Sequence, residues 1–195
     1  MLAQVRPAIV STVFFTLLLG VGYLLAVTGI ARLAFPAQAD GSLLRDASGA
    51  VVGSRLIAQG FDAPRYLQPR PSAAGKGYDA AGSSGSNLGP LSDDLIARET
   101  ESAAAYRAAN GQGAVPADAV TASASGLDPD VSPANAALQA RRIAAARGVS
   151  VAQVEQIIAA HTTGRVFGIL GQPRVNVLEV NLGLDARLPV PPAAR

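Results

Sequence analysis

The longest apolar stretch of the chain lies close to its N-terminus. Residues 7–31, between Arg6 and Arg32, carry no charge over 25 positions. At about 1.5 Å per residue, a helix of this length exceeds the roughly 30 Å hydrocarbon core of a bilayer. Apolar residues occupy every face of it, so it needs lipid or a large protein interior around it. The pattern predicts a short tail over 1–7, a transmembrane helix over 8–31 and one domain over 32–195.

A cleaved signal peptide is the main alternative for this stretch. Ala37-Gln38-Ala39 is an A-x-A-like cleavage site, and cleavage after it would release a secreted binding module. Signal peptides have apolar regions of about 7–15 residues, so the length favours an anchor. Arg6 precedes the stretch, whereas Arg32 and Arg45 follow it. Positive charges on both sides leave the orientation undecided.

The domain that follows has three segments with helical patterns. One begins at Ser132-Pro133, an N-cap residue followed by proline at the first helical position, and ends before Gly148. Another has apolar residues at helical spacing after Ser150. These features predict helices over 91–110, 132–147 and 150–161.

Short apolar runs between these segments are typical of strands. In the last run, Leu178, Val180 and Leu182 alternate with polar or small residues, as in a half-buried strand. The runs predict strands over 51–58, 165–170 and 175–184. Mixed helices and strands indicate an α/β or α+β domain, tethered by the single N-terminal transmembrane helix.

Composition excludes several kinds of chemistry. The chain has no cysteine, so a cysteine-ligated zinc, an iron–sulfur cluster, a thiol nucleophile and a disulfide framework are excluded. His161 is the only histidine, which excludes a two-histidine metal site within one chain. The net charge is only +2, and the arginines do not cluster with aromatic residues, so we expect no nucleic-acid binding.

The serines and the single lysine leave one enzymatic alternative open. Ser-Lys hydrolases use a desolvated lysine to activate a serine, so a membrane-anchored periplasmic hydrolase is one interpretation. Lys76, however, lies between Gly75 and Gly77, a setting typical of an exposed loop, where lysine is a poor base. The same residues do not form a phosphate-binding loop, because Gly77 stands where that motif needs Ser or Thr. The sequence carries no self-sufficient catalytic centre.

The loops carry the most specific motifs. Residues 68–90 are rich in Gly, Ser, Ala and Pro, and structureless loops of this length are often functional. An ordered set of strings follows along the chain: Arg70-Pro71-Ser72-Ala73, Tyr78, Ser83 to Pro90, Thr121 to Pro129, Gln139, Arg142 and Gly171 to Leu178. This set resembles the C subunits of the Kdp system, the bacterial high-affinity potassium-transporting P-type ATPase. The resemblance extends from Arg6-Pro7 to Asn181-Leu182. Asp130 departs from it, since a histidine is common there.

The resemblance implies a role in a larger assembly. Such subunits have one membrane helix in the bacterial inner membrane, with a cytoplasmic N-terminus and a periplasmic domain. Their partners are a potassium-channel-like subunit, a P-type ATPase pump subunit and a small membrane subunit. They are non-catalytic: the pump subunit hydrolyses ATP, and the C subunit assembles or stabilises the complex and acts as a catalytic chaperone that raises the ATP affinity of the pump.

The resemblance also implies a nucleotide contact. It assigns this contact to Gln139, although no cofactor is expected to bind tightly and ATP would reach the chain only through the pump subunit. A periplasmic domain cannot meet cytoplasmic ATP, so the periplasmic location and the nucleotide contact conflict unless the topology or the assay differs.

Residue chemistry gives candidates for the partner interface. Gly and Ser allow a close approach of two backbones, and Asn both donates and accepts hydrogen bonds. We hypothesise that the 68–90 loop orders only against the partner subunits, although simple turn chemistry is the alternative for each residue. The candidates are Arg70, Pro71, Ser72, Tyr78, Ser86, Asn87, Ser123, Ser125, Gly126, Asp128, Arg142 and Asn176.

Overall fold

The computed structural model describes residues 2–46 and 48–189. The chain divides into two compact units, residues 1–43 and residues 44–195.

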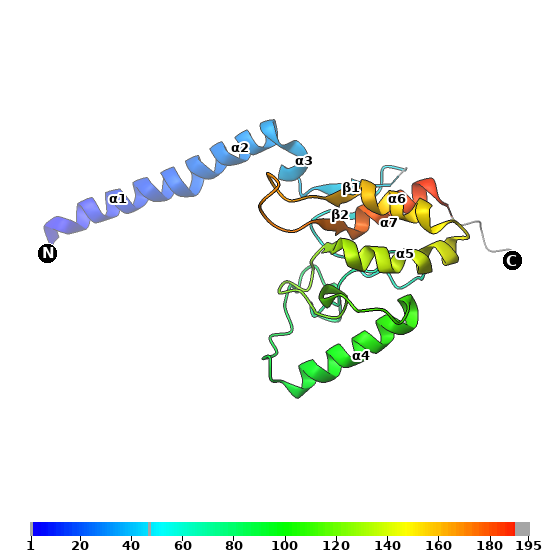
Figure 1. Ribbon diagram of the computed structural model, residues 1–195. Coiled ribbons are helices and arrows are strands. Elements are labelled where there is room, and N and C mark those ends of the chain that lie inside the picture. The colour runs from blue at the N-terminus through cyan, green and yellow to red at the C-terminus, as the bar shows by residue number, and fades with distance from the viewer. Residues whose placement is uncertain (1, 47, 190–195) are drawn as a thin grey trace. The chain divides into compact units, whose positions relative to one another are not determined.

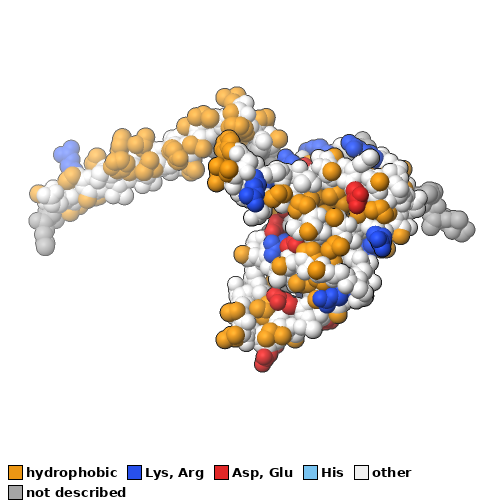
Figure 2. Space-filling model, in the orientation of Figure 1, with side chains coloured by type: hydrophobic (Ala, Val, Ile, Leu, Met, Phe, Trp, Pro, Cys, Tyr) orange, Lys and Arg blue, Asp and Glu red, His pale blue; other side chains and the backbone are white. Residues whose placement is uncertain are grey.

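The first unit is a long apolar helix. A short 3₁₀ turn, η1 (Leu2–Gln4), leads into α1 (Val5–Leu17), a π-helical segment η2 (Leu18–Tyr23) and α2 (Leu24–Ala34). The continuous helix Val5–Ala34 is long and apolar enough to cross a membrane, and none of its most apolar part is buried. Hydrophobic side chains cover it along its length (Figure 2). The apolar helix predicted over 8–31 is confirmed and extends a few residues further at each end. A short α3 (Pro36–Ala39) follows.

The second unit contains two small antiparallel sheets. β1 (Leu43–Arg45) is hydrogen-bonded to β2 (Val51–Ser54). The other sheet has the order β3-β5-β4, with β3 at Asp130–Val131, β4 at Thr162–Thr163 and β5 at Arg174–Asn176. Val175 is the central partner, opposite Val131 on one side and Thr162 on the other. Separate helices and short antiparallel strands make this an α+β domain, as predicted.

The three predicted helices are confirmed. They are α4 (Asp93–Asn110), α5 (Pro133–Arg147) and α6 (Val151–Ala160). The Ser132 hydroxyl accepts a hydrogen bond from the Asn135 amide at the start of α5, and Gly148 adopts a left-handed conformation at its end. α6 begins with a capping box formed by Ser150 and Gln153. A short 3₁₀ helix, η3 (Ala117–Ala119), lies between α4 and α5.

The hydrophobic core lies where α5, α6 and a further helix, α7 (Val177–Arg187), meet the strand β5. Figure 1 shows these helices gathered on one side of the domain, with α4 packed against α5 and η3. Fully buried apolar side chains from every one of these core elements contact one another: Ile143, Val154, Val175, Val180 and Leu184. No residue of α4 is buried, so this helix contributes little to the core.

Arg147 is buried at the end of α5, where its side chain is fully shielded from solvent. Its guanidinium donates to a carboxylate oxygen of Asp185 at 2.8 Å and to the backbone carbonyls of Arg65 and Leu188, both at 2.8 Å. The sequence suggests only a favourable cation at a helix C-terminus. In the structure, the hydrogen bonds of Arg147 join α5 to the C-terminal end of α7 and to the 61–70 segment.

The strand predicted over 165–170 is wrong, and the strand predicted over 175–184 is right only at Val175 and Asn176, which belong to β5. Residues 177–187 form α7, because Asn176 accepts a hydrogen bond from the Glu179 amide and starts a helix there. Its buried residues follow helical spacing, which the alternation of leucine and valine concealed: Val177, Leu178, Val180, Asn181 and Leu184. Residues 165–170 form a turn closed by a bridge between Val166 and Leu170. The strand predicted over 51–58 ends at Ser54.

Candidate functional site

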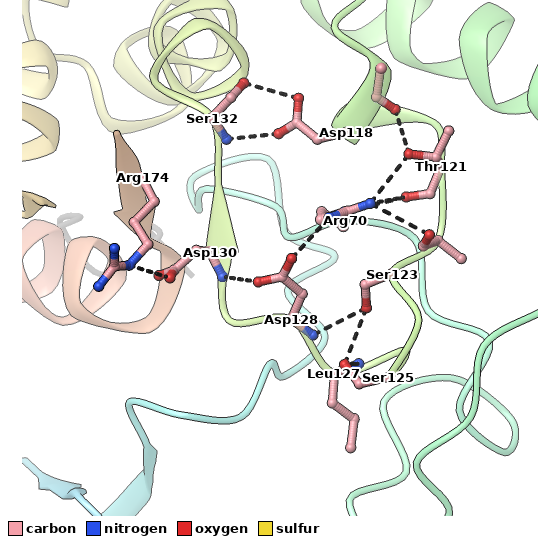
Figure 3. A network of polar contacts seen from close by, with 12 residues as sticks. Arg70, Asp118, Thr121, Ser123, Ser125, Leu127, Asp128, Asp130, Ser132 and Arg174 are labelled. Carbon is pink, nitrogen blue, oxygen red and sulfur yellow. Dashed lines mark hydrogen bonds and ion pairs between the residues drawn. The ribbon is translucent and has the colours of Figure 1, made fainter. Parts of the chain in front are cut away.

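Two loop segments far apart in the sequence pair with each other, and we call them the paired loops: residues 70–85 and 121–128. Arg70 joins them (Figure 3). Its guanidinium forms an ion pair with Asp128 at 2.9 Å and donates to the Thr121 hydroxyl at 3.3 Å and carbonyl at 3.4 Å. Both partners of the ion pair are mostly shielded from water, so the pair fixes the relative position of the two loops.

Ser72 organises the inside of the first loop. Its hydroxyl donates to the Gly126 carbonyl at 2.6 Å and accepts from the backbone amides of Ala74 and Tyr78 at 3.2 and 2.8 Å. The Tyr78 hydroxyl in turn donates to the Arg70 carbonyl at 2.9 Å. Burial raises the pKa of Tyr78, and the nearby Asp62 carboxylate raises it further. The phenol therefore remains protonated and keeps its donor role at neutral pH.

Gly126 sits where the backbones of the two loops come closest. Its φ is +66°, and a Cβ at this position would lie 2.5 Å from the Ser84 carbonyl oxygen and 2.7 Å from the Ala74 nitrogen. A Cβ on Gly85 would meet the Ala124 carbonyl oxygen at 2.9 Å. The glycines allow close approach within this chain. The hypothesis that the 68–90 loop orders only against partner subunits stays a prediction, although its paired part also has hydrogen-bond partners within this chain.

The serines of the second loop accept hydrogen bonds from nearby backbone amides, as is common in turns. The Ser125 hydroxyl accepts from the Leu127 amide at 3.1 Å, and the Ser123 hydroxyl accepts from the Asp128 amide at 3.4 Å. The Asp128 carboxylate also accepts from the Asp130 amide at 3.1 Å. Figure 3 shows these side chains directed into the loop that they close. Their hydroxyls stabilise the shape of the loop.

Gln139 is hydrogen-bonded to the segment that precedes the first of the paired loops, and it is 2% exposed. Its amide oxygen accepts from the Gln68 amide at 2.9 Å and from Arg142 at 2.7 Å. Its amide nitrogen donates to the Gln68 carbonyl at 3.1 Å and to the Asn135 side chain at 2.9 Å. Both donors and both acceptor positions of this amide are thus in use inside the chain.

Three members of the surrounding polar network were not among the candidates from the sequence: Tyr106, Asp118 and Asn135. The Tyr106 hydroxyl donates to the Asn135 side chain at 2.9 Å, and Asn135 donates to Asp118 at 3.1 Å. Asp118 also accepts from the backbone amide and the hydroxyl of Ser132. Burial, followed by the Asp118 carboxylate, raises the pKa of Tyr106 to about 12. The only sequence signal here was the local cap at Ser132, which does not point to partners on other elements.

Arg142 connects this network to the 61–70 segment. It donates to the carbonyls of Pro64 at 2.6 Å and Tyr66 at 3.1 Å, and to the Asn110 side chain at 2.9 Å. Burial lowers the pKa of its guanidinium, which nevertheless stays charged at neutral pH. Arg142 was a candidate interface residue, and its donors are directed within the chain.

A cavity of about 380 Å³ opens beside Gln139. Aromatic side chains line it together with polar groups, and among the described residues Asp62 is its only charged lining residue. The volume suits an uncharged ring, but the lining offers neither a cation nor a phosphate-binding loop for a triphosphate. The residues present therefore do not fit ATP here. Its walls include Phe61, Pro71, Tyr78, Tyr106 and Asn135.

A second cavity, of about 510 Å³, carries three aspartates. Asp118 and Asp128 are engaged as described above, and Asp130 forms an ion pair with Arg174 at 3.1 Å. Burial raises the pKa of Asp130 despite that pair and a hydrogen bond from Asn176. Within residues 2–46 and 48–189, no group of three or more potential ligand side chains is placed to hold a metal ion.

The remaining candidates fall into different surroundings. Asn176 caps α7 and donates to the Arg55 carbonyl at 2.9 Å. Ser86 and Asn87 lie just beyond the paired loops, and Asn87 is exposed with a φ of +53°. Lys76 is exposed as well. The Ser72 hydroxyl hydrogen-bonds the backbone groups of Gly126, Ala74 and Tyr78, so the described contacts of this serine include no lysine.

Sequence similarity to known proteins identifies the family of this chain. Residues 5–186 match the family model described as KdpC: K+-transporting ATPase, c chain. The chain belongs to the KdpC family. Proteins named potassium-transporting ATPase KdpC subunit are 62% identical to it in Caulobacter sp. (strain K31), over 97% of this chain and 96% of the relative. The relative from Beijerinckia indica is 58% identical, over 97% of both chains. The relative from Gemmatimonas aurantiaca is 51% identical, over all of this chain and 98% of the relative.

The KdpC resemblance seen in the sequence is thereby confirmed over nearly the whole chain. Several loop motifs that carried the resemblance, Arg70 to Ala73, Ser83 to Gly85 and Thr121 to Asp128, lie in the paired loops. In this KdpC chain those motifs form a network of internal hydrogen bonds.

Proposed function

We propose that the chain is a non-catalytic subunit of an ATP-driven, high-affinity potassium import complex. In this role it stabilises the assembly and raises the affinity of the pump subunit for ATP. Relatives that carry the name potassium-transporting ATPase KdpC subunit support this proposal. The observation that carries it is the pairing of the two loops. Arg70, Ser72 and Asp128 use their polar groups for contacts within the chain, and these contacts hold the loop surface in one shape.

The proposed partners are a potassium-channel-like subunit, a P-type ATPase pump subunit and a small membrane subunit. The apolar helix Val5–Ala34 supports a single-pass arrangement. We place it in the bacterial inner membrane with the N-terminus in the cytoplasm and the domain in the periplasm. Pro71, Ser86 and Asn87 are the best-placed interface candidates, because they lie at or beside the paired loops without organising them.

ATP would bind in the pump subunit, and the chain would alter that binding through subunit contacts. The cavity beside Gln139 supports this route, since Asp62 is the only charge that the described residues place on its walls. The nucleotide contact that the family resemblance assigns to Gln139 stays a prediction. Such a contact would compete with the four hydrogen bonds that its amide already makes.

Co-purification tests the assembly role. Membranes of potassium-starved cells are solubilised in detergent, the chain is captured by an affinity tag, and its partners are identified by mass spectrometry. We expect a pump subunit and a channel-like subunit, with potassium-stimulated ATPase activity in the captured material. A strain that lacks this chain, with the tag moved to the pump subunit, is the control and should yield less channel-like subunit. A chain captured alone, or with unrelated partners, would contradict the proposal.

A further inference from the structure

The connection between β4 and β5 ends in an exposed apolar turn, residues 166–170. Val166, Phe167, Ile169 and Leu170 all expose large hydrophobic side chains there, and Phe167 is 88% exposed. Figure 1 shows this connection as a narrow orange loop at the edge of the domain. Single exposed apolar residues are ordinary, but four around one narrow turn form a patch that a protein normally covers.

The turn is built as a defined structure. Val166 and Leu170 exchange backbone hydrogen bonds at 2.9 and 3.0 Å, and the Ile169 amide donates to the Val166 carbonyl at 3.2 Å. Phe167 has a φ of +54°, which costs a bulky residue roughly 1–2 kcal/mol. In this strained backbone conformation the aromatic ring of Phe167 is exposed to solvent. The backbone amides of Val166, Gly168, Ile169 and Leu170 are paired within the turn, which reduces the cost of placing it in an apolar or lipid surrounding.

The charge around the turn favours an anionic surface. Between Glu155 and Glu179 the chain has no acidic residue, while Arg165 and Arg174 flank the turn. Arg174 is paired with Asp130, whereas the Arg165 guanidinium donates to the neutral side chain of Gln172 at 3.1 Å. An exposed arginine next to an aromatic and aliphatic tip is the pattern of segments that bind the interface of anionic bilayers.

The membrane helix keeps the turn within reach of such a bilayer. The helix ends at Ala34 and the domain begins at Leu44. Nine intervening residues span at most about 30 Å when extended, and a domain of this size has a radius of gyration of about 15 Å. Tethering also raises the effective concentration of the turn at the bilayer, so a small apolar patch suffices.

We propose that the apolar turn Val166–Leu170 inserts into the interfacial region of the membrane that the N-terminal helix spans, with Arg165 at anionic lipid headgroups. The turn then acts as a second membrane contact that restricts how the domain is oriented on the bilayer. This inference depends on the membrane helix and is independent of the proposed effect on ATP affinity.

The sequence allows a direct test because the chain contains no tryptophan. Phe167→Trp places a single fluorescent reporter at the tip, and Leu91→Trp, at a site that is 91% exposed, is the matched control. The full-length variants are reconstituted into phosphatidylcholine vesicles with and without phosphatidylglycerol. Flotation with the vesicles verifies the membrane helix separately from the turn.

We expect the tryptophan emission of the F167W variant to shift to the blue, with quenching by lipids brominated near the headgroup. Aqueous acrylamide should quench it at least about twofold less than the L91W control. Adding Ile169→Asp should abolish the shift while flotation persists, and Arg165→Gln should remove its dependence on phosphatidylglycerol. Water-like emission equal to the control would overturn the proposal. A shift that appears only when partner subunits are present would also overturn it and assign the turn to a protein contact.

Discussion

The side-chain amide of Gln139 is hydrogen-bonded to both backbone groups of Gln68, a residue 71 positions away. Asn181 makes the same pair of bonds to the neighbouring Leu67, at 2.8 and 2.9 Å. Two amide side chains from α5 and α7 thus replace the backbone partners that a sheet would provide. They fix the chain immediately before Arg70, where the paired loops begin.

Gln139→Ala should therefore destabilise the domain strongly. The substitution removes the partner that the Gln68 backbone, Asn135 and Arg142 share in a buried setting. We expect a loss of about 2–4 kcal/mol in the free energy of unfolding. Thermal unfolding of the full chain in detergent, followed by circular dichroism, measures it. Gln112→Ala, at an exposed loop position, is the control and should change the midpoint little.

Asn181→Ala separates the structural role of Gln139 from the predicted nucleotide contact. Asn181 clamps Leu67 in the same way but does not line the cavity beside Gln139. If both amides act only by holding the 67–68 segment, the two variants should change the apparent KM of the assembled complex for ATP alike. A raised KM with Gln139→Ala alone would instead support a direct nucleotide contact.

Gly126→Ala should disrupt the paired loops. The new Cβ would collide with two backbone atoms, the Ser84 oxygen and the Ala74 nitrogen, and it would also force an unfavourable positive φ. We expect a loss of more than about 2 kcal/mol. Gly148→Ala is the matched control, since Gly148 has a φ of +68° but open space around its Cβ position. It should cost only about 1 kcal/mol, and equal losses in the two variants would contradict the close-approach argument.

Loss of the Arg70–Asp128 ion pair should loosen the first loop. Asp128→Asn removes the charge that faces Arg70 in a partly shielded position, at an expected cost of about 1–3 kcal/mol. Because Lys76 is the only lysine, a lysine-specific protease reports on this loop by a single cut. We expect cleavage several times faster than in the wild-type chain. Asp93→Asn, on the exposed surface of α4, should leave the rate unchanged. Equal rates in both variants would argue against a fixing role for the pair.

Tyr106 should make stability depend on pH in the alkaline range. Its pKa is about 12 in the folded chain, against about 10 for an unperturbed tyrosine. The folded state holds the Tyr106 proton more tightly than the unfolded state does. The contribution of this proton to the free energy of unfolding is therefore complete below about pH 10 and is lost as the pH rises to about 12. Tyr106→Phe should be about 1 kcal/mol less stable than the wild-type chain near pH 8, and this difference should fall as the pH rises from about 10 to about 12. Urea unfolding at a series of pH values tests this, and a constant difference would refute it.

Local signals in the sequence were sufficient for the helices α4, α5 and α6, but not for α7 or for the site. Ser132-Pro133 and Gly148 defined α5 because caps act on their own neighbours. The helix α7 was mistaken for a strand because leucines and valines at alternate positions matched a period of two, while its cap at Asn176 was overlooked. The resemblance identified Arg70, Gln139 and Asp128, but the contacts that join Gln68 to Gln139, Arg70 to Asp128 and Leu67 to Asn181 each link residues more than 50 positions apart. No periodicity encodes such contacts, and only the fold brings them together.

The ATP dependence of potassium-stimulated hydrolysis shows whether the chain raises the affinity of the pump subunit for ATP. The complex is purified with the wild-type chain and, in parallel, from cells that lack it, and initial rates are measured over a range of ATP concentrations. The account predicts a lower apparent KM for ATP when the chain is present, with this effect weakened by Gly126→Ala. An ATP dependence that is the same with and without the chain, in preparations that contain the pump and channel-like subunits in equal amounts, would contradict it.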